Sequence, residues 1–432
     1  MKLPVWPEPS KINKIYLGLE RIRALLAALG NPEKQLSPVF HIAGTNGKGS
    51  VSSFLKYILE ENGYSVNRLT SPHLVRFNER IEVAGKEIED DYYYRLASEC
   101  RAVIENNRLS ASYFEIITAI AFMAFSRCSS DATILEVGMG GRLDATNVID
   151  SPLVSIITSI SLDHVHCLGD TVEKIALEKI AIAKSGRPIV IAKQKESVEK
   201  IMREAAQSLN CPIYSPGKDW EYLKFDDSCR FIGFGKEIET PIPGLEGRHQ
   251  LINAAAAIAS LLCQDKLKIT DGSICRGIKN TRWRARLQNL KGTIIYSHVD
   301  SNSELYLDAA HNEGGASALL DWLNDRDEKN KMRNILIICM LQRKDSRSFI
   351  KILGSRFSER IIVSNSNEEY KTPEEFTREF EDIGLDVHGV YTNVVEALEK
   401  TKNIGKPGER KRILICGSLY FCGEVLSLIE DY

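Results

Sequence analysis

The sequence predicts an α/β protein in which a large N-terminal domain with a mostly parallel sheet precedes a smaller C-terminal α/β domain. Three observations predict this fold class. The chain has 432 residues, whereas one domain usually has about 100–200. Short apolar runs alternate with helical patterns in the first part, which is typical of a mostly parallel sheet. A second strand and helix series then follows a change of composition near residues 286–291.

The N-terminal elements follow one another as strand and helix. Apolar residues at helical spacing predict a helix over residues 15–29, which ends at Gly30-Asn-Pro32. The predicted strands of this domain are 39–43, 132–137, 153–158 and 188–192, and its further predicted helices are 51–61, 113–126, 171–184 and 250–263. Residues 214–243 are aromatic and charged in short runs, which indicates a β-rich excursion from this alternation.

The second series has the pattern of a Rossmann-like domain. Its predicted strands are 305–308, 335–339, 361–363 and 413–416. We therefore expect one domain over residues 1–288 and a second over 289–432.

Composition limits the classes of partner. The 56 basic and 58 acidic residues give a net charge of −2, without the basic excess typical of nucleic-acid-binding proteins. Small-molecule ligands are expected, and no nucleic acid. The ten cysteines lack C-x-x-C pairs, which disfavours zinc ribbons and disulfide frameworks. No apolar run approaches the length of about 18 residues that spans a membrane. We expect a cytoplasmic protein with reduced thiols and no membrane contact.

A glycine-rich segment lies between the predicted strand 39–43 and the helix 51–61. It consists of Gly44, Thr45, Asn46, Gly47, Lys48, Gly49 and Ser50. Backbone amides at such a position converge on phosphate oxygens, while a lysine adds charge and a serine hydroxyl can bind Mg²⁺. The spacing G-x-x-G-K-G-S differs from G-x-x-x-x-G-K-[ST], and the alternative is a glycine-rich turn with an incidental lysine. The flanking elements favour a P-loop ATPase domain.

With this loop, several further segments resemble the folylpolyglutamate synthase branch of the Mur-ligase superfamily. Two are long: residues 70–81 and Ile134-Leu-Glu-Val-Gly-Met-Gly-Gly-Arg-Leu-Asp-Ala-Thr-Asn147. Shorter matching segments are residues 160–164, 176–181, 247–253, 308–312 and 417–421. They extend from one end of the chain to the other, so the resemblance covers nearly all of it.

The resemblance implies an ATP-dependent ligase that adds L-glutamate to dihydropteroate, to reduced folates bearing glutamate, or to both, through an acyl phosphate. It also implies a monomer. Alternatives within the superfamily are a folylpolyglutamate synthase without the first activity and a muramyl-type amino-acid ligase. A nucleotide-binding regulatory module without catalysis is the alternative from another class.

The resemblance also implies two Mg²⁺ sites. The first would be held by Ser50, Ser71 and Glu136, and the second by Glu136, His164 and a carbamylated Lys179. Lys48, Glu136, His164 and Lys179 would be the catalytic residues. Without the resemblance, Lys179 reads as an ordinary surface lysine of its helix. His164 and His166 form an H-x-H pair, but the sequence offers no third zinc ligand nearby.

The remaining implied residues bind the organic ligands. Those for the nucleotide are Asn253, Arg286 and Asp308; those for the pterin-bearing substrate are Ser112, Phe114 and Asp144; and those for glutamate are His311 and Ser418. From the residues alone, Phe114 is equally a core residue and Asn253 a satisfied polar residue of its helix. One departure from the family is Trp283-Arg-Ala-Arg286, where the family has W-P-G-R.

Overall fold

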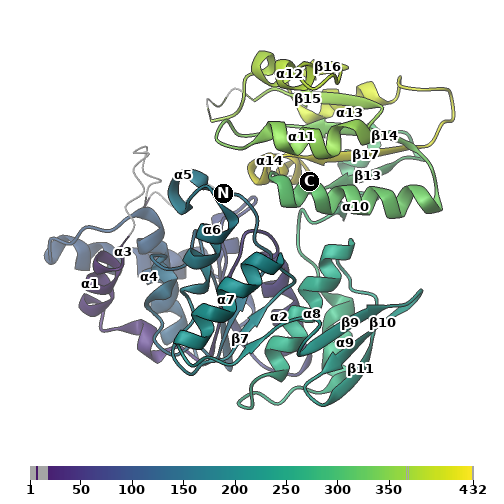
Figure 1. Cartoon of the computed structure of the whole chain (residues 1–432). Coiled ribbons are helices and arrows are strands. Elements are labelled where there is room, and N and C mark those ends of the chain that lie inside the picture. Colours follow the sequence, from purple (N-terminus) through teal and green to yellow (C-terminus); the bar gives the residue numbers. More distant parts are fainter. Residues whose placement is uncertain (1–5, 8–17, 366, 368, 431–432) are drawn as a thin grey trace. The chain divides into compact units, whose positions relative to one another are not determined.

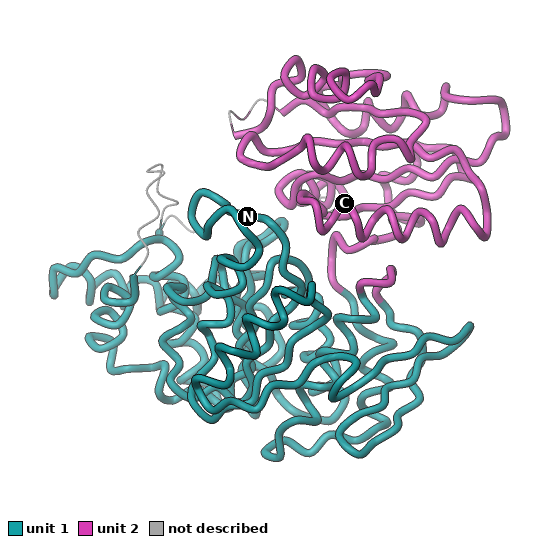
Figure 2. The backbone as a smooth tube through the Cα atoms, in the orientation of Figure 1, with its two compact units in different colours: residues 1–244, 250–282 teal, residues 245–249, 283–432 magenta. Residues whose placement is uncertain are grey.

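The computed structural model describes residues 6–7, 18–365, 367 and 369–430. The chain divides into two compact units, coloured separately in Figure 2. Unit 1 contains residues 1–244 and 250–282, and unit 2 contains residues 245–249 and 283–432. The domain boundary between residues 288 and 289 stays a prediction.

Unit 1 is built on a large, mostly parallel sheet (Figure 1). In spatial order its described strands are β4 (Lys86–Glu87), β3 (Ile81–Val83), β2 (Val66–Leu69), β5 (Ala132–Glu136), β1 (Val39–Ala43), β6 (Val154–Ile157), β7 (Ile189–Ile191) and β8 (Ile213–Tyr214). All neighbours from β2 to β8 pair in parallel, whereas β2, β3 and β4 pair antiparallel. The predicted parallel sheet is therefore confirmed.

Helices surround this sheet. Those of unit 1 are α1 (Glu20–Ala28), α2 (Lys48–Glu61), α3 (Asp90–Asn106), α4 (Tyr113–Ser126), α5 (Val165–Leu168), α6 (Val172–Ile180), α7 (Glu196–Ser208), α8 (Arg248–Leu262) and α9 (Asp271–Asn280), with 3₁₀ turns η1 (Pro32–Gln35), η2 (Phe77–Arg80) and η3 (Ala145–Val148). The first two residues of α8, Arg248 and His249, belong to unit 2. Val39 and Leu135 lie in one apolar core with α1, α3 and α4. Ala43 on β1 and its cross-strand partner Ile157 on β6 lie in a second apolar core, which includes residues of α6 and α7. Helix α2 contacts β1, β5 and α9.

Several predicted elements differ at their ends. Residues 15–17 of the first predicted helix lie outside the described residues, and its described part is α1. The helix expected over 171–184 ends at Ile180, because the chain turns at residues 181–186 before β7. The β-rich excursion is confirmed as a separate antiparallel sheet of β9 (Trp220–Lys224), β10 (Ser228–Gly233) and β11 (Lys236–Pro241).

Unit 2 has its own mostly parallel sheet. Its described strands, in spatial order, are β12 (Gln288–Asn289), β13 (Glu304–Leu307), β17 (Lys411–Cys416), β14 (Arg333–Ile338), β15 (Glu359–Val363) and β16 (Gly389–Tyr391). Only the β12–β13 pairing among these is antiparallel. The helices are α10 (Glu313–Lys329), α11 (Ser346–Leu353), α12 (Pro373–Glu381), α13 (Val394–Thr401) and α14 (Leu419–Glu430), with turns η4 (Ile294–His298) and η5 (Gly354–Arg356).

Within the described part of the chain, no helix is both long and apolar enough to cross a membrane. The ten cysteines are all free thiols.

Candidate active site

The glycine-rich segment leaves the carboxyl end of β1 and enters α2 at Lys48. Gly44 has φ of 150°, and a Cβ atom there would lie 1.8 Å from Oγ1 of Thr158. The backbone therefore passes too close to β6 for any side chain at this position. The Thr45 amide donates to Ser159 O at 2.9 Å, and Thr45 Oγ1 donates to Ser161 O at 3.1 Å. These bonds fix the loop between its strand and its helix.

Lys48 lies at the first position of α2, where backbone amides of a helix attract anions. Its Nζ donates to the carbonyls of Gly44 at 3.1 Å and Thr45 at 3.3 Å. The ammonium group is thus held over its own loop, within reach of any phosphate that the loop amides bind. This geometry agrees with the phosphate site predicted from the sequence.

The carboxyl ends of four adjacent parallel strands bring the predicted metal ligands to one edge of the sheet. Ser71 follows β2, Glu136 ends β5, Ser50 follows the loop after β1, and His164 follows β6. Cross-strand pairs Leu69–Leu135 and Ile42–Glu136 show that these strand ends are level. Ligand sites of parallel sheets form at this edge.

The donor set fits a hard divalent cation. The Oγ atoms of Ser50 and Ser71 are both buried and have no hydrogen-bond partner among the described residues. A buried hydroxyl without a partner is costly, and a cation supplies one. Glu136, which is 5% exposed, adds a carboxylate at the same edge. No cluster of three or more His, Cys, Asp or Glu side chains in the described ranges could hold a metal, so a softer, zinc-type site is disfavoured there.

Lys179 is buried near the end of α6 and is 5% exposed. Burial and, to a smaller extent, the positive charge of Lys48 lower the pKa of its amine to about 7, against the opposing effect of Asp163. In the described part of the chain no carboxylate forms an ion pair with it. Gly141 explains the close fit, since a Cβ atom there would lie 2.5 Å from the Glu178 carbonyl and 3.0 Å from Cα of Lys179.

His164 occupies a more open position. It precedes α5 with φ of 50°, and its side chain is 42% exposed. The neighbouring Asp163 accepts a bond from the His164 amide at 2.8 Å through Oδ1, and its own side chain is 11% exposed. Asp163 therefore ties the backbone of His164 and attracts the Lys179 amine.

Asn253 on α8 lies against the phosphate loop. A Cβ atom at Gly47, where φ is 95°, would lie 2.5 Å from Asn253 Oδ1. The Asn253 Nδ2 donates to Gln250 Oε1 at 3.0 Å, which orients the amide. Asn253, predicted for the nucleotide, is therefore next to the loop that would hold the phosphates.

Two of the residues predicted for the pterin, Phe114 and Asp144, contact the loop that follows Glu136. Ser112 caps α4, with its Oγ accepting from the Glu115 amide at 3.4 Å. The ring of Phe114 covers Gly138, where a Cβ atom would lie 2.7 Å from it. Asp144 is buried and accepts from the Met139 amide at 3.0 Å and from Thr146 Oγ1 at 2.6 Å. Burial raises the pKa of Asp144, while these hydrogen bonds oppose the rise.

Unit 2 gathers its predicted residues at the carboxyl edge of its own sheet. Asp308 follows β13 and accepts from the amides of Leu287 and Ala310, both at 2.8 Å. Ser418 follows the adjacent β17 and is buried. His311 hydrogen-bonds through Nδ1 with Ala309 O at 2.7 Å.

Arg286 lies between two residues with left-handed backbones. The φ angles are 52° at Ala285 and 44° at Leu287. In the pattern W-P-G-R that the resemblance implies, position 285 would be glycine, which adopts this conformation without a steric cost. The departure from W-P-G-R therefore places an ordinary residue in a backbone that favours glycine.

A cavity of about 390 Å³ lies elsewhere in unit 1. Its lining includes Pro38 and Val39 at the start of β1, Leu153 before β6 and Arg187 before β7. It therefore opens at the amino edge of the sheet. None of the predicted site residues lines it, so we base the candidate site on the carboxyl edge and its chemistry.

Sequence reasoning missed some residues of the site. Asp163, Gln250 and Thr158 are examples: the first attracts Lys179, the second orients Asn253 and the third packs against Gly44. Asp163 lies in the matched segment 160–164, directly before His164, and Gln250 lies in the matched segment 247–253, three residues before Asn253. Their short distance in sequence from these predicted residues was the signal that could have found them.

Comparisons with known proteins identify the family of the chain. Residues 42–261 match the family model of the Mur ligase middle domain, and residues 291–428 match that of the dihydrofolate synthetase C-terminal domain. The dihydrofolate synthase/folylpolyglutamate synthase of Bacillus subtilis is 33% identical, over 94% of this chain and 94% of its own.

Solved structures are similar over nearly the whole chain. Escherichia coli FolC in complex with DHPP and ADP has a TM-score of 0.84 at 30% identity, covering 97% of this chain and 95% of the other. A bifunctional folylpolyglutamate synthase/dihydrofolate synthase with Mn, AMPPNP and L-glutamate bound has a TM-score of 0.82 at 27% identity, covering 96% and 95%. The chain therefore belongs to the dihydrofolate synthase/folylpolyglutamate synthase family of Mur-type ligases.

Proposed function

We propose that this chain is an ATP-dependent ligase that joins L-glutamate to dihydropteroate and extends folyl-glutamates by the same chemistry. The observation that carries the proposal is the gathering of the phosphate loop, two partnerless serine hydroxyls and Glu136 at one sheet edge. The family supports the reaction class, since the related structures hold ADP, AMPPNP, Mn, DHPP or L-glutamate.

The reaction needs an activated carboxylate, because a free carboxylate does not condense with an amine in water. The terminal phosphoryl group of ATP passes to a carboxylate oxygen of the acceptor, which gives an acyl phosphate and ADP. The neutral amine of glutamate then attacks the acyl carbon, and phosphate leaves with the former carboxylate oxygen. The amine gives up its proton as the amide forms. Such transfers depend mainly on positioning and charge neutralisation.

The residues of unit 1 meet those needs. The amides of Gly47 to Ser50 and the Lys48 ammonium would hold the phosphates, as the helix N-terminus favours. Ser50, Ser71 and Glu136 would hold one Mg²⁺, and Glu136, His164 and Lys179 a second. Bound there, the metal ions would neutralise charge on the transferring phosphoryl group.

Lys179 would join the second metal site as a carbamate. Its neutral amine forms a bond to the carbon of CO₂ and releases one proton, leaving an anionic oxygen ligand. The lowered pKa of this amine supports the step, because an amine with a pKa of about 7 is about half neutral at pH 7 and largely neutral in slightly alkaline solution. Its burial without an ion-pair partner in the described chain supports it as well.

The organic ligands follow the family pattern. We propose Asn253, Arg286 and Asp308 for the nucleotide, and His311 and Ser418 for glutamate. Phe114 would offer an aromatic face for the pterin, and Ser112 and Asp144 would be its polar partners. Since the Asp144 carboxylate already holds its own loop, its role would combine ligand contact with loop geometry. We infer further that the enzyme acts as a monomer in the cytoplasm.

An ATP-consumption assay with glutamate and, separately, dihydropteroate or tetrahydrofolate tests the proposal. ADP formation with both acceptors is the expected result. Formation with tetrahydrofolate alone would select the folylpolyglutamate synthase alternative, and formation with neither would overturn the proposal. Lys48→Ala should abolish turnover with each acceptor. Lys174→Ala is the matched control, because this lysine is exposed and pairs with Asp170 on the surface.

A further inference from the structure

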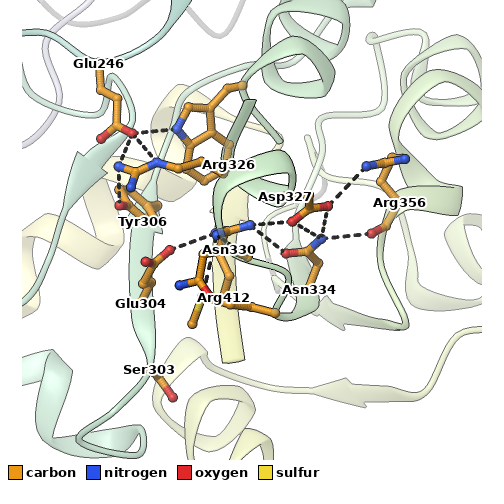
Figure 3. A network of polar contacts seen from close by, with 12 residues as sticks. Glu246, Ser303, Glu304, Tyr306, Arg326, Asp327, Asn330, Asn334, Arg356 and Arg412 are labelled. Carbon is orange, nitrogen blue, oxygen red and sulfur yellow. Dashed lines mark hydrogen bonds and ion pairs between the residues drawn. The ribbon is translucent and has the colours of Figure 1, made fainter. Parts of the chain in front are cut away.

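Residues 245–249 form a short segment that packs with unit 2, although the chain on both sides of it belongs to unit 1. The carboxylate of Glu246 anchors it to α10. Its Oε1 accepts from Trp322 Nε1 at 2.7 Å, from Arg326 Nε at 2.8 Å and from Arg326 Nη2 (Figure 3). Three donors on a single carboxylate oxygen make a directional clamp rather than a loose surface ion pair.

Helix α10 is a fixed support for this clamp. Asp327, one residue beyond Arg326, accepts from Arg412 Nη1 at 2.7 Å and from Arg356 Nη2 at 3.1 Å (Figure 3). Arg412 is 1% exposed, so the end of α10 is tied to the core of unit 2. Burial acts to lower the pKa of Arg326, yet attraction to Glu246 holds it above the ordinary value.

The segment runs directly into α8, which begins at Arg248. Arg248 Nε donates to Asp325 Oδ2 at 2.8 Å, a second contact with α10. Gly247, with φ of 108°, lies so close to His249 that a Cβ atom would be 2.5 Å from its ring. Two residues into α8 the helix carries Gln250, which orients Asn253 against Gly47 of the phosphate loop.

We propose that Glu246 is a positioning residue for the nucleotide: its clamp on α10 fixes the first turn of α8 and thereby the Gln250–Asn253 pair beside the phosphate loop. Glu246 has no direct contact with that loop, so it acts through the helix. The inference rests on the nucleotide site of the proposed function and adds a residue to which no role is assigned above. It predicts that the clamp and Asn253 are energetically coupled.

Calorimetric binding of ADP with Mg²⁺ tests the proposal without requiring turnover. Glu246→Ala should weaken ADP binding about fivefold, and Glu246→Gln, which keeps one acceptor oxygen, should restore part of it. Glu359→Ala is the matched control. It removes a half-buried carboxylate that pairs with Arg333 at 3.2 Å in the same unit, away from residues 245–249. It should leave the dissociation constant within about twofold.

A double-mutant cycle with Asn253→Ala separates positioning from a general structural effect. If Glu246 acts through Asn253, Glu246→Ala should add little in the Asn253→Ala background. An unchanged dissociation constant in Glu246→Ala, or the same loss in both backgrounds, would overturn the proposal. If Glu246→Ala does not fold, Trp322→Phe removes one donor while keeping an aromatic ring, and the same cycle applies. A wild-type chain that binds ADP but never turns over would refute the ligase and leave this test intact.

Discussion

Two buried basic side chains show how differently the two units use such groups. Arg412 in unit 2 is 1% exposed and is met by Glu304 at 2.8 Å and Asp327 at 2.7 Å. Lys179 in unit 1 is 5% exposed, yet no carboxylate of the described chain pairs with it, and burial lowers the pKa of its amine. Separating a buried charge from the partners that the protein supplies destabilises the fold, whereas a buried basic group without such a partner marks a candidate functional site.

The largest expected effect is the loss of activity on replacing Lys179, the basic side chain without an ion-pair partner. Lys179→Ala should lower kcat by about a thousandfold or more, roughly 4 kcal/mol of barrier, because the second metal site loses its anionic oxygen. Steady-state turnover with glutamate and a pteroate measures it. Added acetate or formate should restore part of the activity, whereas Lys174→Ala should change nothing. Full activity in Lys179→Ala would remove the carbamate from the mechanism.

The paired cation should matter for stability instead. Arg412→Ala takes a buried guanidinium away from Glu304 and Asp327, and although Asp327 keeps its contact with Arg356, we expect a loss of about 3 kcal/mol. Urea unfolding of the full chain measures this loss. The control is Arg347→Ala, whose exposed pair with Asp382 contributes at most about 1 kcal/mol. Equal losses in the two variants would mean that the Arg412 network is not a stabilising one.

Removing the Lys179 amine should stabilise the free protein. Lys179→Met exchanges a buried amine for an apolar side chain of similar length, and we expect a gain on the order of 2 kcal/mol near pH 7 without ligands. Thermal unfolding in bicarbonate-free buffer measures the gain. A loss of stability would show that the amine already has favourable partners in the folded state.

The same variant carries a pH signature. The fold lowers the pKa of Lys179 from 10.5 to about 7, so between these values protons bind preferentially to the unfolded chain. The wild type therefore loses stability as the pH falls from about 10 to 7, and this penalty stays constant below 7. The advantage of Lys179→Met should follow that curve and vanish above about pH 10. A gain that does not change with pH would have another cause.

The smallest expected effect is a change in stability that depends on the backbone conformation at Ala285 and not on a charged side chain. Ala285 has φ of 52°, beside Arg286. Ala285→Gly should stabilise unit 2 by about 1 kcal/mol, because alanine in the left-handed region is strained by about that amount. Chemical unfolding measures it, and a loss of stability would mean that the backbone there gains nothing from glycine. The result would show whether the departure from W-P-G-R has a cost.

The sequence predicted the elements that follow regular patterns. The parallel strands β1, β5 and β6 are apolar runs, and the loop after β1 has a regular spacing of glycines, so the sequence was sufficient to predict them. Strand β2 was not, because Asn67 and Arg68 interrupt its apolar pattern. Both are buried, Arg68 being paired with Glu82 and Asn67 Nδ2 bonding to Ser130 at 2.8 Å. Ser71 was therefore assigned through the resemblance, without the strand that positions it.

Site residues could be predicted from the sequence where their role depends on residue type. They could not be predicted where the role depends on which side chains pack together in the fold. Nothing in residues 171–184 indicates that Lys179 is buried, since that follows from Gly141 lying against the Lys179 backbone. The role of Gln250 likewise depends on a side-chain contact one helical turn away. The segment 245–249 is a comparable case, because its sequence position lies well before the second series of strands.

That segment decides how the protein can be cut and recombined. A gene fragment starting at residue 283 would encode every strand of the second sheet yet leave Trp322 and Arg326 without the acceptor that Glu246 provides. A chimaera that exchanges C-terminal halves between homologues would carry a foreign five-residue piece against α10. Matching residues 245–249 to the donor of α10 is therefore the condition for a successful swap.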